Sequence, residues 1–160
     1  MHRTSATADE PMIDAHGLRI GIVVSAYHAE ITAPLETGAV EAFAERGGRA
    51  DDLVRVAVPG AFELVPVAAA MAAREDLHGV VTLGCIVRGE TRHDRWLAQA
   101  VANALASLAA TSAKPVAFGV LTVERLRQAR ERAGGSKGNK GREAMLAALA
   151  AVRAIQAVRR

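Results

Sequence analysis

The sequence predicts an α/β protein in which helices cover both faces of a parallel sheet. Short apolar runs rich in β-branched residues alternate with segments of helical periodicity along the chain. Such alternation requires right-handed crossovers, which place successive strands parallel. The chain has 160 residues, 51% of them hydrophobic, and contains no internal repeat or linker. We therefore expect one domain with a substantial core.

Each expected strand is a short apolar run, and the second ends at Pro59-Gly60. The strands are predicted over residues 19–25, 53–58, 79–87 and 115–122. In a parallel sheet their carboxyl ends share one edge, where ligands bind in folds of this class. The polar residues that follow the strands are therefore candidates for a site.

The helices are predicted from apolar spacing and from their end signals. Leu97, Val101, Leu105 and Leu108 follow a helical period, and Gly47-Gly48 is a typical stop. We expect helices over residues 31–48, 61–74, 93 to about 112, and 123–134, and a last helix that follows a glycine- and lysine-rich loop.

Composition limits the class of protein. Cys85 is the only cysteine, so no intrachain disulfide can form, and a reduced, cytoplasmic setting fits. No segment approaches the ~20 apolar residues of a membrane helix. Residues 1–16 lack the apolar region of a secretory signal and are expected to be a flexible arm before a domain at 17–160.

Charge is distributed unevenly along the chain. Residues 114–160 hold 11 Lys or Arg and 3 Asp or Glu, a balance of +8, whereas residues 1–113 hold 9 and 14, a balance of −5. A basic final third can bind nucleic acid, a small anion or an acidic surface in an oligomer. Because no aromatic residues are interleaved for base stacking, nucleic acid ranks last.

The stretch RGETRH, residues 88–93, leaves the third strand and leads into a helix. Gly89 allows close backbone approach, Thr91 can donate to a phosphate oxygen, and the free amides of the helix start favour an anion. His93 can exchange a proton near neutral pH. By local sequence alone, Thr91 or Asp94 as an ordinary helix cap is the favoured interpretation, and His93 could as well be a surface histidine.

Three further stretches admit a functional and a structural interpretation. Tyr27 could stack on a flat ring or be a loop tyrosine, and PGAFE (59–63) could bind a polar ligand or supply core and helix-end residues. ERAGGSKGNKG (131–141) is not a P-loop by its spacing. It could grip a phosphate through Arg132 and Lys140 or be a solvated basic loop. Cys85 has no adjacent base and is predicted to be buried and inert, and no cluster has metal-ligand spacing.

The order and spacing of these motifs are more specific than any one of them. PGAFE, LGCIVRGETRH, PVAFGVLT, ERAG and GNKG resemble the 6,7-dimethyl-8-ribityllumazine synthase family over roughly residues 17–155. The resemblance implies a flavodoxin-like three-layer α/β/α sandwich with a four-stranded parallel sheet. It also implies an enzyme of riboflavin biosynthesis that condenses 5-amino-6-(D-ribitylamino)uracil with 3,4-dihydroxy-2-butanone 4-phosphate and needs no cofactor.

The resemblance also implies roles for individual residues. His93 matches the proton-transfer histidine, and Glu143 matches an acidic residue near it. Residues that match the phosphate site are Gly89, Glu90, Thr91 and Arg132. Residues that match the pyrimidine and ribityl sites are Tyr27, Ala61, Phe62, Glu63, Cys85, Ile86, Val87, Phe118 and Lys140. In the family, a neighbouring subunit contributes the residues that match Phe118, Arg132 and Lys140.

The implied partners are the two small substrates and further copies of the chain. The family forms pentamers, and in many members these assemble into a hollow icosahedral shell of 60 subunits, with riboflavin synthase as a candidate partner. The short turn at 131–141 favours a shell. Two departures from the family pattern, Arg92 and the run Asp94-Arg95-Trp96, alter the charge beside His93.

Two other functions compete with this interpretation. A non-catalytic homologue that binds a flavin or lumazine, or only forms a shell, would be expected to lose His93 or Arg132, and both are present. A generic nucleotide-binding module would carry a glycine-rich turn after the first strand, and SAYHAE has none.

Overall fold

The computed structural model of the chain describes residues 13–160. Four strands alternate with helices, and the remaining elements follow the fourth strand. The elements are, in order, β1 (Ile20–Ser25), α1 (Ala29–Glu45), the 3-10 turn η1 (Ala50–Asp52), β2 (Leu53–Val58), α2 (Leu64–Ala72), β3 (Gly79–Val87), α3 (His93–Ser112), β4 (Val116–Val123), α4 (Leu126–Arg132), β5 (Ala133–Gly135), β6 (Gly138–Asn139) and α5 (Lys140–Val158).

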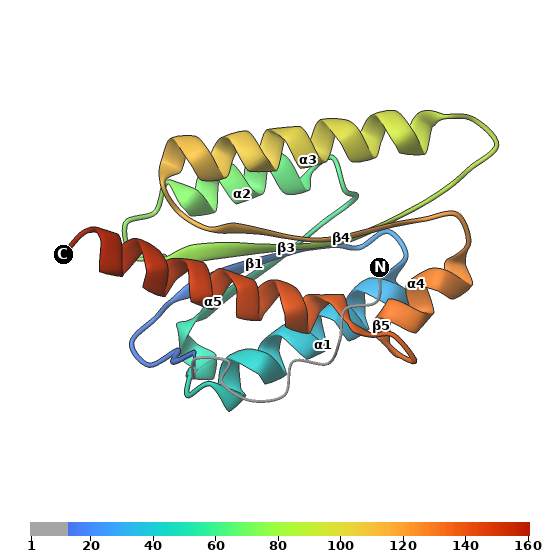
Figure 1. The fold of residues 1–160 in the computed structure, drawn as a ribbon. Coiled ribbons are helices and arrows are strands. Elements are labelled where there is room, and N and C mark those ends of the chain that lie inside the picture. The colour runs from blue at the N-terminus through green and yellow to red at the C-terminus, as the bar shows by residue number, and fades with distance from the viewer. Residues whose placement is uncertain (1–12) are drawn as a thin grey trace.

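The main sheet has the strand order β2-β1-β3-β4, and all neighbouring strands are parallel. Helices α2 and α3 cover one face, and α1 and α5 cover the other (Figure 1). This is the predicted three-layer α/β/α sandwich with four parallel strands, and the fold class is confirmed. Within residues 13–160, no helix combines the length and apolar character that crossing a membrane requires.

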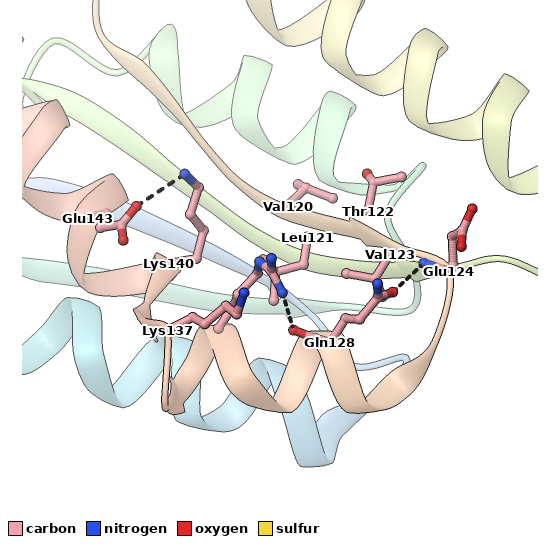
Figure 2. Close-up of a pocket in the computed structure, with 10 residues that line it drawn as sticks. Val120, Leu121, Thr122, Val123, Glu124, Gln128, Lys137, Lys140 and Glu143 are labelled. Carbon is pink, nitrogen blue, oxygen red and sulfur yellow. Dashed lines mark hydrogen bonds and ion pairs between the residues drawn. The ribbon is translucent and has the colours of Figure 1, made fainter. Parts of the chain in front are cut away.

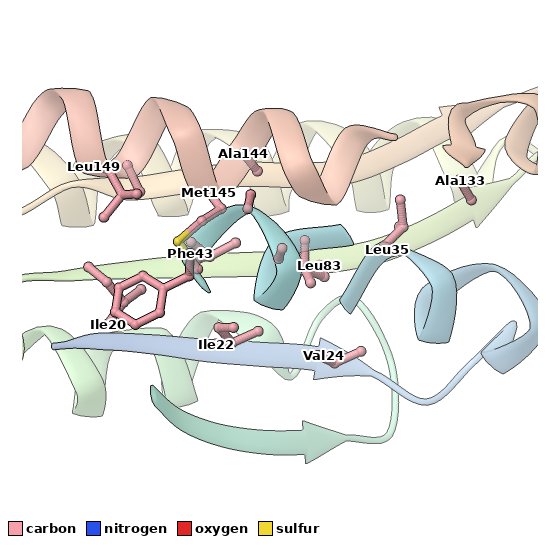
Figure 3. Packing of buried hydrophobic residues seen from close by; sticks show 14 of the residues in the cluster. Ile20, Ile22, Val24, Leu35, Phe43, Leu83, Ala133, Ala144, Met145 and Leu149 are labelled. Atoms are coloured by element: carbon pink, nitrogen blue, oxygen red, sulfur yellow. The ribbon is translucent and has the colours of Figure 1, made fainter. Parts of the chain in front are cut away.

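Two hydrophobic clusters fill the space between these layers. Alternate residues of β1, Ile20, Ile22 and Val24, point toward α1 and α5, where Phe43 and Met145 close the larger cluster (Figure 3). The second cluster lies under α2 and α3 and contains Val23, Leu64, Val80, Val101 and Leu105. Because both faces of the central strands are buried, β1 is apolar throughout rather than alternating.

The structure corrects the predicted bounds of the first helix. It begins at Ala29 instead of residue 31, because the His28 carbonyl accepts bonds from the amides of Ile31 and Thr32, at 2.9 and 3.0 Å. It ends at Glu45 instead of Gly48, because Gly47 has a φ of 88° and turns the chain away. Gly47-Gly48 does mark the end of this helix, but the predicted bounds included both glycines, which lie beyond its last residue.

Three other predicted segments also differ. The fourth helix occupies residues 126–132 rather than 123–134, because β4 continues to Val123 and β5 begins at Ala133. The second helix occupies residues 64–72 rather than 61–74, and Pro66 lies in its first turn, as expected. The basic segment at 134–141 is not only a loop, since β5 and β6 form a two-stranded antiparallel hairpin. Gly134 and Gly138, with φ values of 99° and 82°, make this tight turn possible.

The expected N-terminal arm falls mostly outside the described residues, which begin at residue 13. Residues 13–16 lie on the domain. Ala15 is fully buried, and its amide donates to the Arg46 carbonyl at 2.8 Å. The Arg153 guanidinium on α5 donates to the carbonyls of Asp14 and His16, each at 2.9 Å, so this segment is fixed against the last helix.

Candidate active site

The carboxyl ends of β1, β2 and β3 open into one cavity of about 630 Å³, which we call the strand-end cavity. The amides of Ala26 and Tyr27 donate to the carbonyls of Val58 and Pro59, at 2.7 and 3.1 Å, and so hold the loop after β1 beside the PGAFE turn. Residues predicted for the site that line this cavity are Tyr27, Ala61, Phe62, Glu63, Cys85, Ile86, Val87, Gly89, Thr91 and His93. Three stretches distant in sequence therefore meet at one edge of the sheet.

The two aromatic side chains of the strand-end cavity are open to solvent in the single chain. Tyr27 is 68% exposed and Phe62 is 62% exposed. The Tyr27 ring meets the His28 ring edge-on, with centroids 4.6 Å apart. Apolar surface of this size at a cavity mouth is available to a flat ligand ring or to another subunit.

Cys85 lines the same cavity but is only 3% exposed. Burial, together with a smaller contribution from the Glu30 carboxylate, raises the pKa of its thiol to about 11. At neutral pH the side chain is therefore a neutral, apolar wall of the cavity, as predicted, and is unsuited to act as a nucleophile.

The RGETRH segment connects β3 to α3 beside the strand-end cavity. The Arg88 amide donates to the Val123 carbonyl at 2.9 Å, which fixes the start of the loop to the end of β4. The Thr91 hydroxyl accepts from the His93 amide at 3.4 Å, a long contact that leaves the hydroxyl available to a ligand. His93 is exposed at the first residue of α3, beside the free amides of the helix start.

Glu90 lies on the other side of this segment. It lines a separate groove of about 490 Å³ with Arg92, Arg95 and Thr122. The strand-end cavity and this groove share Gly89 and Thr91. The predicted phosphate loop is thus accessible from two sides, and Glu90 does not line the cavity that His93 lines.

The remaining predicted residues lie elsewhere on the chain. Arg132, Lys140 and Glu143 line a cavity of about 430 Å³ between β4, α4 and the start of α5, which we call the hairpin cavity (Figure 2). Phe118 is 39% exposed on the edge strand β4, outside both cavities. The single chain therefore does not bring Arg132 and Lys140 to the cavity that contains His93.

Local bonds fix the geometry of the hairpin cavity. The Arg132 guanidinium donates to the Gln128 carbonyl at 3.1 Å, and Lys140 pairs with Glu143 at 3.2 Å. The Gln128 side chain accepts from the amides of Glu124 and Arg125, both at 2.9 Å, and so caps α4 (Figure 2). Residues 13–160 contain no group of three or more His, Cys, Asp or Glu side chains arranged to hold a metal ion.

Asn139 was not singled out from the sequence, although it lies in the GNKG motif. Its side-chain oxygen accepts from the Arg142 amide at 3.0 Å and caps α5, and its amide group donates to the Pro34 carbonyl of α1 at 3.0 Å. An Asn directly before an apolar helical period is a recognisable cap signal. The second bond, to a residue 105 positions away, could not be read from sequence.

Fold and site together define an α/β protein with a cavity at the carboxyl ends of a parallel sheet and a histidine at a helix start beside it. Comparison with known proteins identifies the family within this class. Residues 17–156 match the model of the 6,7-dimethyl-8-ribityllumazine synthase family, and the chain belongs to this family.

Individual relatives agree with this family. The chain is 39% identical over 125 residues to 6,7-dimethyl-8-ribityllumazine synthase of Aquifex aeolicus, covering 78% of this chain and 81% of that protein. It is 44% identical over 118 residues to the enzyme of Porphyromonas gingivalis, covering 74% and 73%. It is 41% identical over 125 residues to the enzyme of Thermus thermophilus, covering 78% and 80%.

Proposed function

We propose that this protein synthesises 6,7-dimethyl-8-ribityllumazine, at a site assembled from the strand-end cavity of one subunit and the hairpin cavity of the next. The activity is that of the family, a transferase reaction of riboflavin biosynthesis. The observation that supports the shared site is the separation of the implied residues, since His93 lines one cavity and Arg132 lines another.

The strand-end cavity suits the pyrimidine substrate. Tyr27 offers an exposed ring for stacking, and the buried wall of Cys85 and Ile86 excludes water from one side. Glu63 can accept from ribityl hydroxyls. The second substrate, 3,4-dihydroxy-2-butanone 4-phosphate, places its phosphate at Gly89–Thr91, opposite Arg132 of a neighbouring subunit.

The reaction needs proton transfers rather than a covalent nucleophile. The aromatic amine attacks the ketone, and loss of water gives an imine. Inorganic phosphate is then eliminated, and ring closure releases a second water. His93 can carry protons at these steps, because an imidazole exchanges a proton near neutral pH. Holding both substrates together supplies much of the acceleration.

The assembly is part of the proposal. We place the protein in the cytoplasm as a pentamer, and the short turn at 131–141 favours a shell of such pentamers. Riboflavin synthase, the chain's candidate partner, would act on the lumazine product. Light scattering of the purified protein separates a pentamer from a shell, because their masses differ twelvefold.

The test of function is direct. Both substrates are mixed with the protein, and lumazine formation is followed by its absorbance and fluorescence. Formation above the uncatalysed rate, with one phosphate released per lumazine, supports the proposal. Lumazine binding without formation would instead support the non-catalytic alternative.

A further inference from the structure

The charged side chains that line the hairpin cavity differ in whether an opposite charge lies close to them. Lys140 lies 3.2 Å from Glu143, and Arg132 lies 3.8 Å from Glu131. Glu124, on the opposite rim, lies 3.4 Å from Arg88. Every charged side chain that lines this cavity thus has an opposite charge within 4 Å, except Lys137, which has none among residues 13–160.

The backbone fixes Lys137 at the cavity. It lies in the turn between β5 and β6, between the left-handed glycines 134 and 138. Its amide donates to the Glu131 carbonyl at 2.8 Å, which ties the turn to the last residues of α4, next to Arg132. Figure 2 shows the Lys137 side chain on the same side of the cavity as Lys140. The backbone of Lys137 is therefore fixed at the cavity, while its side chain is exposed and free to move.

We propose that Lys137 is a second phosphate-binding cation that acts with Arg132 and makes the site selective for the phosphorylated substrate. The inference rests on the proposed function, which places the substrate phosphate at Arg132. Without Lys137, the lining charges are Arg132 and Lys140 against Glu124 and Glu143, a balance of zero. Lys137 therefore supplies the net positive charge of this half of the site.

A phosphate monoester carries close to two negative charges at neutral pH. The guanidinium of Arg132 can fork onto it, but the nearby Glu131 carboxylate opposes part of this attraction. The Lys137 ammonium is a mobile point charge on a flexible stem, and it can follow the phosphate without displacing Arg132. The two cations have different tasks, orientation by Arg132 and charge balance by Lys137.

The test compares the K137Q and K137R variants with wild type in the assembled protein. We expect K137Q to raise KM for the phosphorylated butanone about three- to tenfold, and to weaken binding of inorganic phosphate in titration calorimetry to a similar degree. Its kcat should stay within about twofold, because His93 is untouched. K137R should restore both values, and added salt should reduce the difference between K137Q and wild type.

K114Q is the matched control. Lys114 contacts the Arg74 carbonyl away from both cavities, so this variant removes the same charge elsewhere. If K137Q matches K114Q in KM and in phosphate affinity while wild type forms lumazine, the inference is wrong and the proposed function stands. A wild-type protein that forms no lumazine overturns the proposed function, and the inference with it.

Discussion

At the scale of single residues, His93 contributes little to the fold and lines the strand-end cavity. It is exposed at the first residue of α3, and the part of the chain that the structure describes contains no ion pair of its side chain. We expect His93→Ala to lower kcat about ten- to a thousandfold, because positioning of both substrates persists while proton transfer is lost. Steady-state lumazine formation measures this change.

The control for this prediction is His16→Ala, since His16 is also exposed and lies outside the strand-end cavity. Both variants should unfold at the wild-type temperature. A His93→Ala protein with wild-type turnover would exclude His93 from proton transfer.

Cys85 gives a second prediction at this scale. With the pKa of its thiol raised to about 11 by burial, about one molecule in a thousand carries a thiolate at pH 8. We expect iodoacetamide to alkylate the native protein at least a hundredfold more slowly than the denatured protein. Mass spectrometry of timed samples measures both rates.

The same pKa has a consequence for stability. Because the folded value lies above the value of 9.0 for a free thiol, folding favours the protonated form. This contribution is fully present below about pH 9 and is lost as pH rises toward about 11. Equal alkylation rates in the native and denatured states would contradict the burial on which both statements depend.

At the scale of elements, short apolar runs predicted the four strands, and helical periodicity predicted the main helices, because each of these helices buries one face. Leu35, Ala39 and Phe43 are buried on α1, and Val101 and Leu105 on α3. The β5–β6 hairpin could not be predicted in this way, since its two strands have only three and two residues and no apolar period. The hairpin depends instead on Gly134 and Gly138, whose left-handed backbone makes the tight turn possible.

Asn139 connects two elements and so carries a prediction of its own. Asn139→Ala removes the cap of α5 and the side-chain hydrogen bond to the Pro34 carbonyl of α1. We expect the free energy of unfolding to fall by about 2 kcal/mol, from a cap worth about 1 and a lost hydrogen bond between α5 and α1 worth about 1. Urea denaturation of the variant and wild type measures this difference.

Asn139→Asp separates the two contributions, because the carboxylate still accepts from the Arg142 amide but cannot donate to Pro34. It should lose about half as much stability as Asn139→Ala. If both variants lost the same amount, the bond to α1 would be the only one that matters.

At the scale of the whole molecule, some site residues could be predicted from sequence to lie together, and others could not. The predictable ones are those at the ends of parallel strands, where strand pairing fixes the geometry. Parallel pairing alone brings Tyr27, Glu63 and Val87 to one edge. The placement of Arg132 in a separate cavity depends on the path of α4, which no local pattern encodes. The lining of a second groove by Glu90 was likewise not evident from local sequence.

Separate cavities lead to a prediction about mixed assemblies. If each active site combines His93 of one subunit with Arg132 of the next, a protein containing both His93→Ala and Arg132→Ala chains has some fully wild-type sites. A site is intact when an Arg132→Ala chain supplies the histidine and a His93→Ala chain supplies the arginine. At equal proportions and random order, about one site in four meets this condition.

We therefore expect co-expressed His93→Ala and Arg132→Ala chains to recover about one quarter of wild-type activity, measured at subsaturating phosphorylated substrate, where both single variants are weak. Mixing the two separately assembled variants without subunit exchange is the control, and should give only the mean of their residual activities. A site contained within one chain predicts that same low value for the co-expressed protein, because every chain then carries one defective group. The recovered fraction thus tests whether the strand-end and hairpin cavities act together across the boundary between subunits.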